Sequence, residues 1–264
     1  GFIFGPGLGG TLAAFFGETA PFYVGAAVTA VTVLLSWLVL KESLTPEERA
    51  AWREHGRKMQ VADVTQNLPL LLTLLMGFGA QFSFSMFQST FALFGAAVLF
   101  TQQTPQETSL GVGLLLTAIG IGQFITQMFL IQPLVKRWGE TNLVIIGDLL
   151  RAVGVLSLVV FTSPWLVGAV SLLAFAVGSG LMMPSLQSLA TTTVHDELRG
   201  GVLGVYQSAT SLGVILGSAL GGVLFAVAPT RPFLVGGLLF MGLLLPALAL
   251  RGSVRARVVA APGD

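Results

Sequence analysis

The sequence contains no cysteine, only two histidines and few charged residues. Without cysteine, the chain cannot be a secreted scaffold held by disulfides. Charged residues make up 9% of the 264 positions, against roughly 25% in an average soluble domain, which is too few to cover a water-facing surface. The 13 basic and 12 acidic residues nearly cancel, which argues against a nucleic-acid binder. The 54% hydrophobic content instead predicts an all-α, polytopic helical membrane protein that contacts the lipid bilayer.

Apolar stretches long enough for a membrane-spanning helix, about 20 residues, recur along the chain. The chain opens inside such a stretch, so we interpret residues 1–16 as the second half of a helix whose start precedes Gly1. Seven full spans are expected after it, at residues 21–40, 68–99, 108–135, 142–162, 164–190, 200–227 and 232–250.

The basic residues indicate an orientation for these spans. Eleven of the 13 fall in alternate connections, at 41–67, 136–141, 191–199 and the 251–264 tail, whereas the opposite connections hold only Arg231. Because basic loops stay in the cytoplasm, the long loop and the C-terminus are predicted to be cytoplasmic. Trp37, Trp138 and Trp165 lie at expected span ends, as in an interfacial aromatic belt.

The 41–67 loop contains a helix-start pattern. Thr45 is a candidate N-cap, Pro46 takes the first helical position, and Glu48 follows the cap by three residues. We expect a short helix to about Met59 that lies on the cytoplasmic face of the membrane, with Trp52 towards lipid. Its expected role is to link two bundles.

An internal repeat indicates how the expected helices are organised into units. The segment 1–10 matches 213–222, with glycine at relative positions 0, 4, 8 and 9, and 21–25 matches 232–236. The copies start six spans apart, so both cross the membrane in the same direction, as parallel repeats do. A six-helix unit then assigns 1–40 to the last two helices of an N-terminal bundle whose first four helices are missing. It assigns 68–250 to a complete C-terminal bundle.

Glycines in both copies recur one turn apart and form a small-residue stripe. Such stripes let helices approach closely in a membrane, and Pro6 removes a backbone hydrogen bond and bends its helix. The stripes fit either ordinary helix packing or a hinge at the interface of two moving bundles. The candidate residues are Gly1, Gly5, Pro6, Gly9, Gly10, Gly213, Gly217, Gly221 and Gly222.

Polar residues inside the spans are the candidates for a substrate cavity, because polar groups in hydrocarbon usually face a bundle interior or a cavity. Three helical faces carry them, and interhelical hydrogen bonding is the alternative interpretation. The residues are Gln81, Ser85 and Gln88, then Gln123 and Gln127, then Gln207, Ser208 and Ser211.

Two charged residues, Asp148 and Arg151, lie well inside a span. They are three positions apart on one helix face, so a local charge pair is the first expectation. A proton-carrying carboxylate at Asp148 is the alternative. The sequence predicts no metal site, since His55 and His195 lie in separate loops, and it carries no nucleotide-binding fingerprint. No cofactor is therefore expected.

Two six-helix halves joined by a long loop resemble the major facilitator superfamily, and this chain would then hold helices five (in part) to twelve. Gly1-x-x-x-Gly5-Pro6-x-x-Gly9-Gly10 is similar to a fifth-helix motif of proton-coupled drug antiporters, including tetracycline exporters.

The 132–141 loop resembles a second motif of that superfamily, a charged loop that follows the eighth helix. Arg137 and Gly139 match it, whereas Gln132, Lys136 and Glu140 depart from it. Arg199 at the start of the eleventh helix also resembles the family. The resemblance implies that Arg137, Gly139 and Arg199 contribute to a cytoplasmic gate, beside the charge pair that the spacing predicts for Asp148 and Arg151.

The function implied by the resemblance is secondary active transport in a bacterial inner membrane. We expect proton-coupled efflux of small lipophilic molecules by alternating access, with protons as the coupling ion. A uniporter or symporter for a sugar or other metabolite is the alternative. An enzyme is not expected, because a membrane-embedded active site would need a cluster of catalytic groups at one depth.

Overall fold

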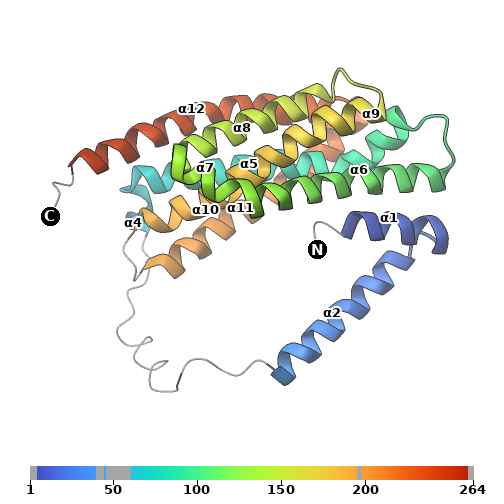
Figure 1. Ribbon diagram of the computed structural model, residues 1–264, viewed down its shortest axis with the longest axis horizontal. Helices are drawn as coiled ribbons and strands as arrows, with labels where there is room; N and C mark the ends of the chain where they lie inside the picture. Colours follow the sequence, from blue (N-terminus) through green and yellow to red (C-terminus); the bar gives the residue numbers. More distant parts are fainter. Residues whose placement is uncertain (1–4, 40–44, 46–60, 195–197, 261–264) are drawn as a thin grey trace.

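The computed structural model describes residues 5–39, 45, 61–194 and 198–260, and within these ranges the chain forms helices and no strands. Figure 1 shows most of the helices running alongside one another in an elongated bundle. Their order is α1 (Gly5–Phe16), α2 (Ala20–Val39), α4 (Val61–Thr65), α5 (Leu68–Phe94), η1 (Gly95–Leu99), α6 (Pro105–Ile125), η2 (Thr126–Leu130), α7 (Ile131–Trp138), α8 (Glu140–Ser157), α9 (Pro164–Leu166), η3 (Val167–Leu172), α10 (Leu173–Thr192), α11 (Arg199–Val227) and α12 (Arg231–Ala260). The η segments are single π-helical stretches continuous with their neighbours.

Six helical stretches in the described residues are long and apolar enough to cross a membrane. They correspond to six of the seven full spans predicted from the sequence. The remaining one, expected at 142–162, is helical as α8 but ends at Ser157. With Glu140, Asp148 and Arg151 within 18 residues, α8 is not apolar enough to be counted with the others.

Capping explains why α6 begins earlier than the expected 108. The Thr104 side chain accepts a hydrogen bond from the Glu107 backbone N–H, and the Glu107 carboxylate accepts one from the Thr104 backbone N–H at 2.8 Å. Pro105 occupies the first turn, where its missing N–H costs nothing. The last helix also differs from expectation, because α12 continues past residue 250 to Ala260.

The centre of the bundle is α5, which packs against α11, α12 and α10, while α8 lies against α10 and α12. Buried phenylalanines join these helices. The Phe87 and Phe175 ring centroids lie 5.1 Å apart, and those of Phe94 and Phe233 lie 4.7 Å apart. Aromatic pairs in this range add to the stabilisation from buried area, so they help to hold α5, α10 and α12 together.

The first two helices lie beside this bundle. In Figure 1, α1 runs along α6, and α2 extends away from the other helices. None of the residues of α2 is buried, although nearly all are apolar. A helix that is apolar on all sides needs lipid or other helices around it. The expected helix that ends near Met59 lies outside the described residues, as do Pro46, Glu48, Trp52 and His55.

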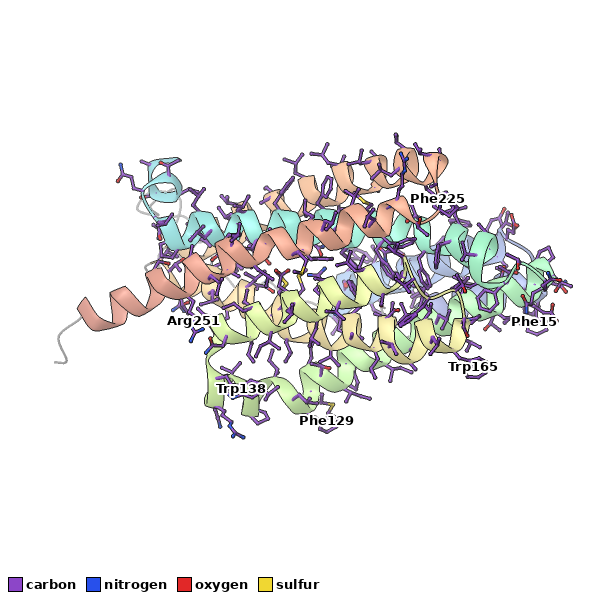
Figure 2. The ribbon with its side chains drawn as sticks, turned by 90° about the horizontal axis from the view of Figure 1, so that it is seen from above. Phe15, Phe129, Trp138, Trp165, Phe225 and Arg251 are labelled. Atoms are coloured by element: carbon purple, nitrogen blue, oxygen red, sulfur yellow. The ribbon has the colours of Figure 1, made fainter. Side chains whose placement is uncertain are left out.

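Large apolar side chains project outward from the bundle. Figure 2 shows Phe129, Trp138 and Trp165 on its outside, with Trp138 and Trp165 towards opposite ends. Trp165 is 87% exposed and Phe129 is 62% exposed. An apolar exterior of this extent is what a bilayer covers, so the fold is that of a multi-pass membrane protein.

Candidate substrate cavity and interhelical contacts

The polar residues on one face of α5 differ in how deeply they are buried. Ser85 is buried, and its hydroxyl donates a 2.8 Å hydrogen bond to the Val214 carbonyl oxygen of α11. Gln81 is half-buried and Gln88 is exposed. Ser85 therefore joins two helices, whereas Gln88 is accessible to a solute.

The polar residues of α11 lie on its exposed side. Gln207, Ser208 and Ser211 are all exposed, and the Gln207 side-chain amide donates to the Ser211 hydroxyl at 3.3 Å. In the α6 region, Gln123 is half-buried and Gln127 is exposed within η2. No hydrogen bond joins Gln123 or Gln127 to the α5 or α11 residues in the described part of the chain. The bond from Ser85 thus joins α5 to the backbone of α11, and no hydrogen bond between described residues joins the three sets of polar side chains to one another.

The second glycine stripe packs inside the bundle. Gly213, Gly217 and Gly221 are buried along α11 against α5. A Cβ at Gly213 would lie 2.5 Å from the Phe78 carbonyl oxygen, and one at Gly217 would overlap the Phe82 carbonyl oxygen. These glycines therefore permit backbone-to-backbone contact between α5 and α11. Gly222 faces open space.

The first stripe makes its contact through a different glycine. At Gly5 and Gly9, no atom lies within 4 Å of the position that a Cβ would take. A Cβ at Gly10, in contrast, would lie 2.7 Å from the Ser109 carbonyl oxygen and 3.1 Å from the Gly113 Cα of α6. Gly10 is thus where α1 and α6 approach most closely among the stripe residues. Gly1 lies outside the described residues, and Pro6 lies within α1.

The two interior charges, Asp148 and Arg151, make no direct hydrogen bond to each other. Asp148 and Arg151 are both fully buried on α8, yet neither Asp148 carboxylate oxygen has a hydrogen-bond partner. The Arg151 guanidinium instead donates to the Ala80 carbonyl oxygen of α5 at 3.1 Å and contacts the Met182 sulfur at 3.4 Å. Asp148 and Arg151 therefore form no direct hydrogen bond, because the long arginine side chain reaches neighbouring helices, and the charge pair expected from their spacing stays a prediction.

Three aromatic rings from neighbouring helices surround that guanidinium. Its central carbon lies 4.4 Å from the Phe240 ring centroid, 5.2 Å from that of Phe175 and 6.0 Å from that of Phe84. A cation over aromatic faces is attracted by the electron-rich ring, more so when water is excluded. Arg151 therefore connects α8 with α5, α10 and α12. The sequence showed the buried charge but carried no signal for these partners.

At the α7–α8 corner, Gly139 has φ +78°, a conformation that side chains other than glycine rarely adopt. Arg137 is exposed just before it, and Arg199 is exposed at the start of α11. The Glu140 carboxylate accepts a 2.6 Å hydrogen bond from the Ser188 hydroxyl of α10. Glu140, which departs from the family motif, thus links the corner between α7 and α8 to α10. Among the described residues, no cluster of three or more His, Cys, Asp or Glu could hold a metal ion.

A bundle of long apolar helices with an apolar exterior defines a polytopic membrane protein. The profile of the Major Facilitator Superfamily matches residues 73–263, and the chain belongs to that superfamily. Its relatives are transporters rather than enzymes, and both the resemblance and the all-α fold expected from the sequence are confirmed.

Individual relatives are resistance proteins. The chain is 30% identical over 244 residues to Multidrug resistance protein 2 of Bacillus subtilis, and the match covers 90% of this chain and 58% of that protein. It is 29% identical over 249 residues to the class D tetracycline resistance protein of Salmonella ordonez, with 93% and 60% covered. The quinolone resistance protein NorA of Staphylococcus aureus is 25% identical over 239 residues, with 88% and 57% covered. The chain therefore spans about three fifths of the length of these relatives.

Proposed function

We propose that this chain is part of a proton-coupled exporter of small lipophilic compounds that works by alternating access. The observation that carries the proposal is the similarity, along about nine tenths of the chain, to proteins named for multidrug and tetracycline resistance. In this mechanism, proton and substrate bias the two access states in opposite directions, so that the proton gradient drives export. Asp148 is a candidate proton carrier because it is buried without a hydrogen-bond partner.

The polar faces support a substrate cavity. Five polar side chains are exposed on helices that are otherwise mainly apolar, and polar groups in membrane helices usually face a bundle interior or a cavity rather than lipid: Gln88, Gln127, Gln207, Ser208 and Ser211. Apolar walls with a few amides and hydroxyls suit small, fairly apolar substrates. A sugar or metabolite transporter remains the alternative function, because amides also bind hydroxyl groups.

We further propose that residues 1–40 and 68–250 belong to two different six-helix halves of the transporter. The close contact at Gly10 between α1 and α6 would then lie at the interface between the halves. A stripe without side chains lets one helix slide along another with little steric hindrance. The proposed location is a bacterial inner membrane, with the C-terminus and the 41–67 loop in the cytoplasm, as the distribution of basic residues indicates.

The test uses the complete reading frame that contains this chain, reconstituted in liposomes under a pH gradient. Lumenal pH is followed while lipophilic drugs are added, and sugars are assayed in parallel. We expect drug-induced proton release that Gly10→Leu abolishes, because the new side chain collides with the α6 backbone. Gly25→Leu on α2, where no atom lies within 4 Å, is the matched control and is expected to retain activity. Sugar uptake without any drug-induced proton movement would contradict the proposal.

A further inference from the structure

The interior of the bundle contains a cluster of polar side chains that is only partly satisfied by protein groups. Its members are Ser83 of α5, Asp148 and Arg151 of α8, and Ser179 of α10, and each is at most 5% exposed. Among the described residues, no hydrogen-bond partner exists for the two serine hydroxyls, for either carboxylate oxygen of Asp148 or for the Nε of Arg151. Because buried polar groups in folded proteins nearly always have a partner, so many unpartnered atoms in one region require an explanation.

The hydroxyl of Ser179 lies beside the Arg151 guanidinium. Phe175, Ser179 and Met182 follow one another at intervals of four and three residues, which places them on one face of α10. The guanidinium contacts the first and the last of them: its central carbon lies 5.2 Å from the Phe175 ring centroid, and its Nη1 lies 3.4 Å from the Met182 sulfur. Ser179 is between these two contacts.

The contacts of α12 place Ser83 near the same guanidinium. A Cβ at Gly236 would lie 3.8 Å from the Ser83 Cβ. Phe240, one turn further along α12, has its ring centroid 4.4 Å from the guanidinium carbon. Arg151 also donates to the carbonyl oxygen of Ala80, which precedes Ser83 by three residues on α5. Ser83 is therefore within about one helical turn of the Arg151 head group.

Close packing of α8 on α10 closes the cluster on one side. A Cβ at Gly147 would lie 2.6 Å from the Gly178 carbonyl oxygen, and a Cβ at Gly178 would lie 3.0 Å from the Arg151 Cγ. Each glycine directly precedes a member of the cluster, Asp148 on α8 and Ser179 on α10. The two backbones therefore meet next to the unpartnered side chains.

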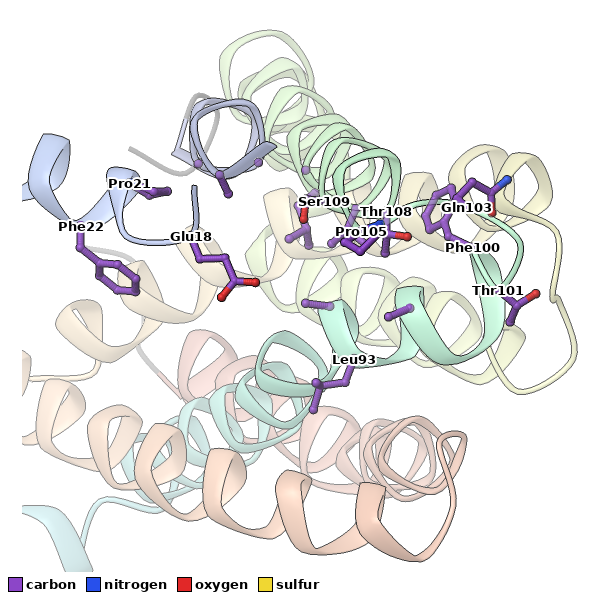
Figure 3. Close-up of a pocket in the computed structure, with 18 residues that line it drawn as sticks. Glu18, Pro21, Phe22, Leu93, Phe100, Thr101, Gln103, Pro105, Thr108 and Ser109 are labelled. Atoms are coloured by element: carbon purple, nitrogen blue, oxygen red, sulfur yellow. The ribbon is translucent and has the colours of Figure 1, made fainter. Parts of the chain in front are cut away.

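The cluster is distinct from the cavity near the first two helices. That cavity has a volume of about 730 Å³, and Figure 3 shows Glu18, Phe22 and Phe100 among the residues around it. None of the four cluster residues lines it. The cluster is instead enclosed by α5, α8, α10 and α12.

We propose that Ser83, Asp148, Arg151 and Ser179 form a buried water-binding site, in which ordered water joins the Asp148 carboxylate to the Arg151 Nε and to the two serine hydroxyls. The hydrogen-bonding capacities of these groups fit water. The carboxylate only accepts, the Nε–H only donates, and hydroxyls and water do both. Buried water typically makes about three hydrogen bonds to groups that otherwise lack a partner. Such water accounts for two opposite charges that share a helix face without a direct bond.

The charges of the cluster favour water over an ion. Asp148 and Arg151 carry one negative and one positive charge, so an added cation or anion would leave an uncompensated charge in a low-dielectric interior. A larger neutral ligand is disfavoured, because the Phe84, Phe175 and Phe240 rings already surround the guanidinium. Water is neutral and fits among closely packed side chains. The site does not depend on the proposed efflux.

The test is hydroxyl-radical footprinting of the complete protein in detergent. A short X-ray pulse produces radicals from water, and mass spectrometry then locates the oxidised side chains. Phe240 and Phe94 are a matched pair, because both are 0% exposed, but Phe94 lies about three turns from Ser83 along α5. We expect Phe240 to be oxidised several-fold faster than Phe94, since the proposed water would generate radicals beside it. Met182 should be oxidised in the same pulse.

The combined variant Ser83→Ala and Ser179→Ala removes two of the proposed partners of the water. It should lower oxidation of Phe240 to the level of Phe94. Ser185→Ala is the control, because Ser185 is also buried on α10 but its hydroxyl donates to the Leu181 carbonyl oxygen at 2.8 Å. This variant should leave the oxidation of Phe240 unchanged.

Two footprinting results would overturn the proposal. One is equal oxidation of Phe240 and Phe94 in the wild-type protein, a comparison that requires no variant to fold. The other is unchanged oxidation of Phe240 in a folded double-serine variant. A rise in melting temperature with sodium that Asp148→Asn removes would also contradict it, because the ligand would then be a cation. None of these measurements involves transport, so their outcome is separate from that of the efflux assay.

Discussion

The guanidinium carbon of Arg151 on α8 lies 4.4 Å from the centre of the Phe240 ring on α12. The same group donates a hydrogen bond to the Ala80 carbonyl oxygen on α5, so one side chain joins three helices. Arginine suits this position because its planar, weakly hydrated head can stack on rings and donate in the same plane. Lysine concentrates its charge in a compact, strongly hydrated group and cannot do both.

Arg151→Lys should therefore lower the stability of the folded protein. We expect a clear fall in the melting temperature in detergent, and a coupling free energy of about 0.5–2 kcal/mol between Arg151→Lys and Phe240→Leu in a double-mutant cycle. The exposed Arg137→Lys is the matched control and should leave the melting temperature within error. Strict additivity of the two interior substitutions would mean that the ring contributes packing alone.

Alanine substitutions at two glycines of α11, Gly217 and Gly222, should have different effects on the stability of the protein. Gly217→Ala places a Cβ against the Phe82 backbone, which cannot move as a side-chain end can, and should cost about 1–3 kcal/mol. Gly221 has a similar environment against Met86 and Ser89. In Gly222→Ala the new Cβ faces open space, so the variant should leave the stability of the protein unchanged or raise it slightly, because alanine favours the helix. Equal melting temperatures for the Gly217→Ala and Gly222→Ala variants would contradict the close packing of α11 on α5.

The polar residues of α5 should separate into a packing role and a transport role. Ser85→Ala removes the bond to the Val214 carbonyl and should lower stability by about 0.6 kcal/mol, the average for an interhelical hydrogen bond in a membrane. Gln88→Ala removes an exposed amide and should leave the melting temperature unchanged while altering the KM of efflux. Thermal melts and initial transport rates of both variants measure this. A loss of stability in Gln88→Ala with unaltered KM would assign Gln88 to packing.

The absence of cysteine makes the topology directly testable. Single cysteines introduced as Thr162→Cys and Lys136→Cys sit at exposed positions near ends of spans on opposite expected sides of the membrane. In intact cells a membrane-impermeant maleimide should label Thr162→Cys, whereas Lys136→Cys should react only after permeabilisation. These 264 residues contribute no thiol of their own, and the protein without an introduced cysteine measures the background labelling. The reverse pattern of labelling would invert the proposed orientation.

Much of the fold was predictable from local patterns. The spans expected at 21–40, 164–190 and 200–227 differ from α2, the α9–η3–α10 stretch and α11 by at most two residues at either end. Apolar length alone determines such helices, because the backbone must satisfy its own hydrogen bonds in a membrane. The expected start of α6 at 108 is wrong, although Thr104-Pro105-Gln106-Glu107 repeats the Thr-Pro-x-Glu pattern that predicts a helix start at Thr45. That capping signal was sufficient to locate it.

The contacts of individual side chains could not be predicted from the sequence. Composition and spacing are enough to predict a helical membrane protein with two glycine stripes and two charges inside a span. The packing of the helices shows which glycines make contacts: Gly213, Gly217 and Gly221 lie against α5, and Gly10 meets α6. It alone placed Arg151 among rings of α5, α10 and α12 rather than on Asp148. Helical spacing shows which residues share a face, but the partner of that face is set by packing between segments far apart in the chain.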